Sequence, residues 1–285
     1  MKMAIDNDIV VIEPKSTSLF KNLHDIWKYK KLLCYLCGRF ARAMYKDTVL
    51  GWLWIVLRAL IPAVVSTIVF GEMAKVPSDD IPYILFFFTG ISLWNLFGNS
   101  MRIITRSIRM GKRFIMNLYF PRILIPIASL WIFMIQFLVY MVLLGGIILY
   151  FYFAHNKLYL VLEPQLFLSF YYIFLTILFT LGIGFFTSIL NTQARDVRFS
   201  VPYLVNMFFF ITPVLYPLSL VPEKWRWIAV INPMSSVIEG FKWSLLGKGE
   251  INLYYQLFSA FSVILIFLAG VWFFTRAEIT LSDNM

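Results

Sequence analysis

Residue types that carry out bond chemistry are sparse in this sequence and do not converge on one site. Cys34 and Cys37 form a C-x-x-C pair, but no second Cys/His pair completes a zinc site and no strand–helix pattern supports a redox motif. His24 and His155 stand far apart in the sequence. The sequence contains no phosphate-binding P-loop, no serine-nucleophile motif and no zinc-protease motif. We therefore expect no catalytic residue, metal or cofactor in this chain.

The elements that position the remaining polar residues are apolar helices. Of the 285 residues, 60% are hydrophobic and only 14% are charged, and the mean hydropathy is +0.78. Soluble domains are closer to half apolar and a quarter charged. Apolar runs of this length must satisfy their own backbone hydrogen bonds in a bilayer, which favours helices. The sequence predicts an all-α polytopic membrane protein whose residues 1–285 form a single transmembrane domain.

Six crossings follow from the apolar runs, within a membrane region of residues 48–275. The predicted crossings are 48–71, 81–101, 123–154, 165–191, 199–220 and 251–275. An even number places both termini on one side of the membrane. Segments assigned to that side carry 18 Lys and Arg residues, against 6 on the opposite side. By the positive-inside rule, the N-terminal segment 1–47 and the tail 276–285 are expected in the cytoplasm.

The N-terminal segment is expected to lie along the membrane. Apolar residues recur at three- and four-residue steps from Leu19 to Met44, and the basic residues fall mostly off that stripe. This pattern predicts an amphipathic helix in the membrane interface. A packed helix of a small cytosolic domain is the alternative.

The stretch 222–246 is apolar but does not read as a seventh crossing. It contains Asn232-Pro233, Glu239 and Lys242, which would be costly in the bilayer core. We therefore expect a re-entrant or interfacial helical hairpin on the outer side, between the fifth and sixth crossings.

A row of arginines follows the second crossing. Arg102, Arg106, Arg109 and Arg113 are spaced four, three and four residues apart, with Lys112 beside them. This spacing places the four guanidinium groups on one face of a helix. Two interpretations stay open: a positive-inside signal that touches anionic headgroups, or a short cytoplasmic helix that docks into a soluble partner.

Arg58 lies inside the first crossing, and the six predicted crossings contain no acid that could pair with it. Its side chain either snorkels to the headgroups or faces a water-filled path and meets an anionic substrate. The lack of acids in the crossings argues against a proton- or sodium-driven carrier. Together with the absence of a catalytic cluster in the loops, it also argues against a membrane enzyme such as a glycan-lipid transferase. Energy for transport would come from a partner.

Aromatic residues are more numerous than interfacial belts require, at 19% of the chain. The surplus either faces lipid and neighbouring helices or lines a path of flat apolar faces suited to sugar rings. Candidates for such a path, besides Arg58, are Trp94, Phe208 and Tyr216.

Several motifs agree in type and order with one family. They are Tyr45-Lys46-x-Thr48-Val49-Leu50-Gly51-Trp52-Leu53-Trp54, Phe70-Gly71, Trp94-Asn95-Leu96-Phe97, Phe120-Pro121-Arg122-Ile123-Leu124-Ile125-Pro126, Arg195-Asp196-Val197-Arg198, Thr212-Pro213-Val214-Leu215-Tyr216-Pro217, Val221-Pro222-Glu223-Lys224-Trp225-Arg226-Trp227 and Asn232-Pro233. Over about residues 45 to 245 the chain resembles the ABC-2 type polysaccharide export permeases, the membrane subunits that export O antigen, capsule or teichoic acid. One departure is Ala59-Leu60, where the family often has Pro-Leu.

The resemblance implies a homodimer of six-helix subunits in the bacterial inner membrane, with a pore at the two-fold axis. Two cytosolic ATPase subunits, which bind ATP and Mg, would dock beneath it, and no nucleic acid is involved. The cargo would be a polysaccharide on an undecaprenyl-pyrophosphate-type lipid, with O antigen expected first. Capsule or teichoic acid, or drugs and small lipids, are the alternatives.

The resemblance also assigns roles to two regions. It implies that the Arg102–Arg113 region, Lys112 included, couples to the ATPase. It implies that the 222–246 hairpin forms a periplasmic gate, with the candidate residues Pro222, Trp225, Trp227, Asn232, Pro233 and Glu239.

Overall fold

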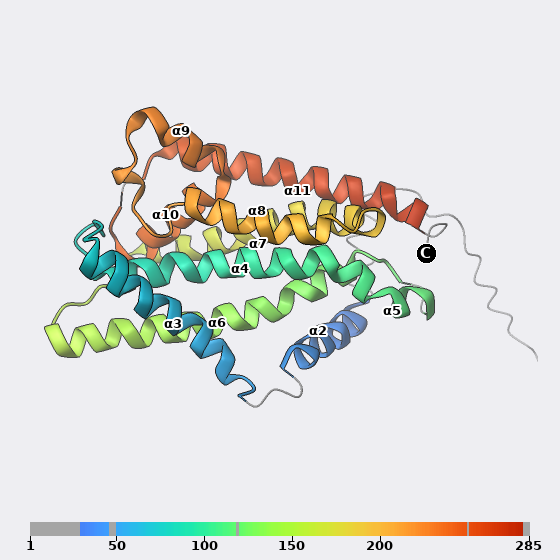
Figure 1. The fold of residues 1–285 in the computed structure, drawn as a ribbon, viewed down its shortest axis with the longest axis horizontal. Helices are drawn as coiled ribbons and strands as arrows, with labels where there is room; N and C mark the ends of the chain where they lie inside the picture. The colour runs from blue at the N-terminus through green and yellow to red at the C-terminus, as the bar shows by residue number, and fades with distance from the viewer. Residues whose placement is uncertain (1–28, 46–49, 118–119, 250, 282–285) are drawn as a thin grey trace, which may run out of the picture.

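The computed structural model describes residues 29–45, 50–117, 120–249 and 251–281, and these ranges are helical with connecting loops (Figure 1). The α-helices are α2 (Lys30–Tyr45), α3 (Leu53–Ser66), α4 (Tyr83–Met110), α5 (Lys112–Asn117), α6 (Leu124–His155), α7 (Leu168–Gln193), α8 (Val197–Ile211), α9 (Glu223–Ile231), α10 (Pro233–Leu246) and α11 (Leu253–Leu281). A π-helical turn, η1 (Thr67–Met73), extends α3. Short 3-10 turns η2 (Pro164–Phe167) and η3 (Leu218–Leu220) precede α7 and α9.

Five helical segments are long and apolar enough to cross a membrane: Leu53–Met73, Tyr83–Met110, Leu124–His155, Pro164–Gln193 and Leu253–Glu278. They correspond to the predicted crossings one to four and six. The predicted fifth crossing, 199–220, differs, because its helix α8 ends at Ile211 after 15 residues. Thr212 is extended, with ψ of 136°, since a residue that precedes a proline is disfavoured in the helical region.

Helix α4 forms the centre of the bundle. Helices α3, α6, α7, α8 and α10 all pack against it, and most of its residues are buried, including the aromatic run Phe86–Phe88. Helices α7 and α11 also pack together so closely that a Cβ atom at Gly182 would overlap the backbone of Phe267. The long helices run nearly alongside one another, so loops gather at two opposite ends (Figure 1).

We name these ends by their contents. The hairpin end holds α9, α10, η1 and the start of α11 (left in Figure 1), and the arginine end holds α5, the last turns of α4 and α11, and the start of α6. At the arginine end a second apolar cluster forms where Leu36 of α2 packs with Ile108, Leu124 and Phe274. Helix α2 therefore belongs to the fold of this end.

The segments outside the crossings agree with the sequence predictions in part. Helix α2 covers the second half of the predicted amphipathic stretch, and its first part, Leu19–Lys28, lies outside the described residues. The 222–246 stretch contains two helices, α9 and α10, as expected for a helical hairpin. Helix α4 continues past the predicted end of its crossing at Met101 to Met110, so the first three arginines of the row extend a long helix.

Candidate functional site

Helix α10, at the hairpin end, has strong local signals at both of its ends. The Asn232 Oδ1 atom accepts a hydrogen bond from the Met234 backbone N at 3.1 Å, which caps the helix. Pro233 follows at the first helical position, where its missing N–H costs nothing. Gly247 ends the helix with φ of +69°, a left-handed conformation that glycine adopts without strain. These signals fix where α10 begins and ends.

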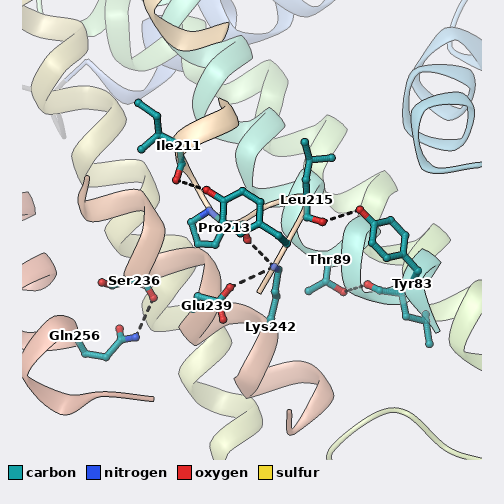
Figure 2. Close-up of polar contacts among 11 residues, drawn as sticks. Tyr83, Thr89, Ile211, Pro213, Leu215, Ser236, Glu239, Lys242 and Gln256 are labelled. Atoms are coloured by element: carbon teal, nitrogen blue, oxygen red, sulfur yellow. Dashed lines mark hydrogen bonds and ion pairs between the residues drawn. The ribbon is translucent and has the colours of Figure 1, made fainter. Parts of the chain in front are cut away.

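Tertiary contacts bury α10 almost completely, which is unusual for a helix with both an acid and a base. Glu239 is 4% exposed and Lys242 is 2% exposed. The Lys242 Nζ atom donates to the Pro213 carbonyl at 2.7 Å and lies 3.4 Å from the Glu239 Oε1 atom (Figure 2). It also lies 3.5 Å from the ring centroid of Phe86 on α4, within cation–π range. Lys242 thus joins α10 to α4 and to the loop that follows α8.

The electrostatics of this pair follow from its burial. Burial lowers the pKa of Lys242 and raises the pKa of Glu239, and the opposite charge of each partner works against the shift of the other. Asp79 adds a further negative charge near the pair. A buried ion pair of this kind costs desolvation, so it specifies one arrangement more than it adds net stability.

A second set of contacts holds the loop from Thr212 to Pro217, which Lys242 also contacts. The Tyr83 hydroxyl donates to the Leu215 carbonyl at 2.7 Å, and the Asn232 Nδ2 atom donates to Thr212 Oγ1 at 2.8 Å. The Tyr216 hydroxyl donates back to Ile211 at 2.9 Å (Figure 2). We call this loop with its partners on α4 and α10 the Lys242 hub. Any outward movement of α10 away from this loop must break the bonds of Asn232 and Lys242 to it.

Helix α11 supports α10 from the other side. The Ser259 Oγ atom donates to the Pro233 carbonyl at 2.8 Å, and Gln256 Nε2 donates to the Ser236 carbonyl at 2.9 Å. The side-chain oxygens of Ser235, Ser236 and Gln256 are buried without a partner among the described residues. Unsatisfied buried polar atoms are few in native proteins, and these three lie where α10 packs against α11.

The candidate gate residues fall into two groups in the structure. Asn232, Pro233 and Glu239 are buried in or beside α10. Pro222, Trp225 and Trp227 are exposed on or before α9, and the two tryptophans are 53% and 59% exposed. The structure therefore joins the first group to the Lys242 hub and leaves the second group on the surface.

At the arginine end the basic residues meet uncharged acceptors. Arg102 donates to the Asn99 Oδ1 atom at 2.8 Å and to the Asn206 Oδ1 atom of α8 at 2.7 Å. Arg109 donates to the Thr192 carbonyl at the end of α7, at 3.3 Å. Arg106 is exposed and makes no hydrogen bond or ion pair with any described residue. Within the described part of the chain, none of these three arginines pairs with a carboxylate.

The side chains of the arginine row are only partly exposed to solvent. Arg102 and Arg109 are half-buried, so part of the face is used inside the chain. Lys112 is exposed at the start of α5, and the side chain of Arg113 lies outside the described residues. Within the described part of the row, the exposed cations are thus Arg106 and Lys112.

The structure does not bring the four candidate path residues together. Arg58 is exposed on α3 and makes no hydrogen bond or ion pair with any described residue. Trp94 is 4% exposed in the core, where its ring lies 5.3 Å from that of Phe97. Phe208 is 43% exposed on α8, and Tyr216 belongs to the Lys242 hub.

Sequence reasoning treated Lys242 only as a charge that argues against a crossing and did not place Asn206 at all. The signal for Lys242 was a base three residues after an acid in an apolar helix, a spacing that allows pairing on one face. The contact between Arg102 and Asn206 spans 104 residues, so no local pattern could have shown it.

Comparison with known proteins agrees with this architecture. The chain is 27% identical over 250 residues to an "O-antigen export system permease protein RfbA" from Klebsiella pneumoniae, covering 87% of this chain and 92% of that protein. It is 25% identical over 230 residues to a protein of the same name from Myxococcus xanthus, covering 79% and 84%. The sequence profile described as "ABC-2 type transporter" matches residues 31–246, from α2 to the end of α10. The chain belongs to the ABC-2 type transporter family.

Proposed function

We propose that this chain is the membrane subunit of an ATP-driven exporter that moves a lipid-linked polysaccharide, O antigen first among the candidates, across the bacterial inner membrane. The observation that carries this proposal is the similarity to O-antigen export permeases over most of both chains. The chain itself holds no nucleotide, and ATP and Mg are bound by a partner. The working unit is a homodimer with two ATPase subunits.

The two ends of the bundle have different roles in this proposal. The arginine end faces the cytoplasm, where Arg106 and Lys112 contact the ATPase. The hairpin end faces the periplasm, where the buried helix α10 closes the path. ATP-driven movement at one end reaches the other through α4, because this helix continues from the arginine row to Phe86 and Gly90 beside Lys242.

Opening of the path requires a change at the Lys242 hub. Lys242 and Tyr83 both bond to backbone carbonyls of the loop after α8, at Pro213 and Leu215. A rigid-body shift of α8 against both α4 and α10 would break these bonds together and expose the pair to water. The open state would then regain the hydration that the closed state gives up. Export is accordingly expected to depend on Lys242 in a way that stability alone does not explain.

A gene deletion tests the polysaccharide assignment. Cells that lack this chain should retain the lipid-linked polymer on the cytoplasmic side and lose it from the cell surface, and a plasmid copy should restore it. Mass analysis of the retained glycolipid identifies the polymer as O antigen, capsule or teichoic acid. Normal surface polymer in the deletion strain, with a drug or a small lipid retained instead, would contradict the proposal.

Arg58 has a separate test, because it is a cation on a spanning helix without a described partner. We propose that it meets the pyrophosphate of the substrate. Arg58→Ala should lower the stimulation of the ATPase by the lipid substrate about tenfold, the effect of losing one charged hydrogen bond. Arg276→Ala, which removes an exposed arginine beside Trp272 on α11, is the control. Equal stimulation in both variants would rule out this role.

A further inference from the structure

A cavity at the hairpin end lies outside the Lys242 hub. It has a volume of about 480 Å³ and lies between η3, α9 and the start of α11. Its lining residues are Leu218, Arg226, Ile251, Asn252, Leu253, Tyr254 and Tyr255. A volume of this size is within the range of sites that hold small molecules or headgroups. None of these residues is one of the six candidate gate residues or part of the arginine row, although Arg226 lies within the 222–246 hairpin.

Arg226 gives the cavity its charge. Its Nε atom is buried and has no hydrogen-bond acceptor among the described residues. No carboxylate in the described ranges pairs with its guanidinium group either. A guanidinium group has five N–H donors and no acceptor, so an anion with several acceptor oxygens can satisfy more of them at once than a single amide or carbonyl oxygen can. Leaving a buried donor unsatisfied is costly, which favours an anionic ligand here.

The start of α11 adds to the same preference. Asn252 Oδ1 accepts from the Tyr254 backbone N at 2.9 Å, which caps a helix of 29 residues. The N-terminus of a long helix carries a partial positive charge, and its first N–H groups lack partners within the helix. Arg226 and this terminus line the same cavity, so their fields add.

The walls of the cavity indicate what kind of anion fits. Leu218, Ile251 and Leu253 are apolar, and Tyr254 and Tyr255 bring phenol groups. Leu253 also begins a candidate membrane span, which places the cavity at the level of the headgroups. Tyrosine is enriched at this level because its ring is apolar and its hydroxyl is polar. A free sugar acid in water would not need the apolar wall.

We propose that this cavity binds the phosphate group of a membrane lipid, with Arg226 as its main ligand and the start of α11 as its second. Two lipids could supply the phosphate: an anionic phospholipid of the bilayer, or a polyprenyl phosphate of the type that carries glycans. The proposal rests on the membrane position of α11 and does not require a polysaccharide cargo.

The test measures lipid binding by native mass spectrometry of the full chain with its ATPase partner in detergent. The probes are phosphatidylglycerol, undecaprenyl phosphate and, as a lipid without phosphate, diacylglycerol. Arg226→Gln should weaken binding of both phosphate lipids about tenfold or more, the range for losing a hydrogen bond to a charged group. Lys224→Gln is the matched control, since it removes an exposed cation from the same helix outside the cavity.

A second variant covers the case in which Arg226→Gln does not fold. Asn252→Asp keeps an equally good helix cap but places a negative charge in the cavity, so it should weaken phosphate binding while α11 stays capped. Equal affinity for the two phosphate lipids assigns the site to bilayer phospholipid, and tighter binding of undecaprenyl phosphate assigns it to a glycan carrier. Unchanged phosphate binding in both cavity variants, or equal binding of diacylglycerol, would overturn the proposal.

Discussion

The two ends of the bundle treat charge in opposite ways. At the hairpin end Glu239 and Lys242 are almost fully buried and contact each other. At the arginine end the hydrogen bonds of Arg102 and Arg109 to described residues go to amide and carbonyl oxygens, and Arg106 makes no hydrogen bond or ion pair with a described residue. Buried charges must be paired, because an unpaired one is very costly, whereas exposed ones keep their water. The Glu239–Lys242 pair is therefore satisfied within the chain, whereas the exposed Arg106 at the arginine end is available to a partner.

The largest effect expected from this comparison is at Lys242. Lys242→Met leaves the Glu239 carboxylate buried without its partner, so the free energy of unfolding should fall by about 3–5 kcal/mol. Arg106→Ala at the other end should change it by less than about 0.5 kcal/mol, since the side chain is exposed. Unfolding in detergent with increasing SDS measures both.

A double variant separates charge pairing from packing at the same site. Glu239→Leu together with Lys242→Met replaces the pair by apolar side chains, and most of the lost stability should return. If Lys242→Met alone is as stable as the parent chain, the hairpin end is not held by this pair and the contrast between the two ends fails.

The tight packing of α10 provides the next largest effect. A Cβ atom at Gly240 would overlap the ring of Tyr172 on α7, and Tyr172 is itself 4% exposed and has little room to move. Gly240→Ala should lower the free energy of unfolding by about 1–3 kcal/mol, the usual cost of overpacking. The matched control is Gly145→Ala on α6, where no atom lies within 4 Å of the new Cβ. Equal stability of the two variants would contradict the packing described here.

A smaller effect is expected where α8 meets α4 at the arginine end. Asn206→Ala removes the Asn206 Oδ1 acceptor from Arg102, which keeps its second bond to Asn99. The loss should be about 1 kcal/mol, because water reaches this exposed contact and replaces part of the bond. Asn156→Ala, at the opposite end of the bundle, is no substitute as a control because Asn156 adopts a left-handed φ of 52°. Ser200→Ala on α8 serves as the control instead. If Asn206→Ala lowered the free energy of unfolding as much as Lys242→Met does, the contrast between the two ends would fail.

The smallest effect concerns the pH dependence of Cys37 on α2, which packs at the arginine end. Burial, with a contribution from Cys34, raises the pKa of the Cys37 thiol to about 11. The reactive thiolate is therefore scarce below that pH, and alkylation of Cys37 at pH 8 should be about a hundredfold slower than for a thiol with the pKa of 9.0. Cys34→Ser leaves Cys37 as the sole cysteine for this measurement and removes the smaller contribution of Cys34 to its pKa, so that burial alone is tested. Its alkylation rate should keep rising above pH 9, and a plateau near pH 9 would show that α2 does not bury the thiol.

Much of the fold could be predicted because long apolar runs report directly on spanning helices. Five of the six predicted crossings correspond to helices long enough to cross a membrane. The fifth was predicted too long, although Thr212-Pro213 contains the signal that ends α8. The predicted crossing continued past this proline to Leu220, because Val214, Leu215 and Leu218 continue the apolar run.

The site was less predictable because its contacts join distant parts of the chain. The bond from Tyr83 to the Leu215 carbonyl spans 132 residues, and the bond from Lys242 to Pro213 spans 29. A sequence shows which side chains carry charge but not which of them the fold buries. The arginine row had clear spacing, yet only the structure shows that Arg102 and Arg109 turn toward α8 and α7.

The central claim is that the arginine end is the docking surface for an ATPase partner and the hairpin end is not. Charge reversal at Arg106, alone and together with Lys112, tests it by co-purification of the ATPase with the tagged chain. We expect the Arg106→Glu/Lys112→Glu variant to lose the ATPase while it remains folded in detergent, since both side chains are exposed. Lys157→Glu, which matches the single reversal on an exposed residue at the hairpin end, should retain it. A normal complex with the double variant would contradict the account.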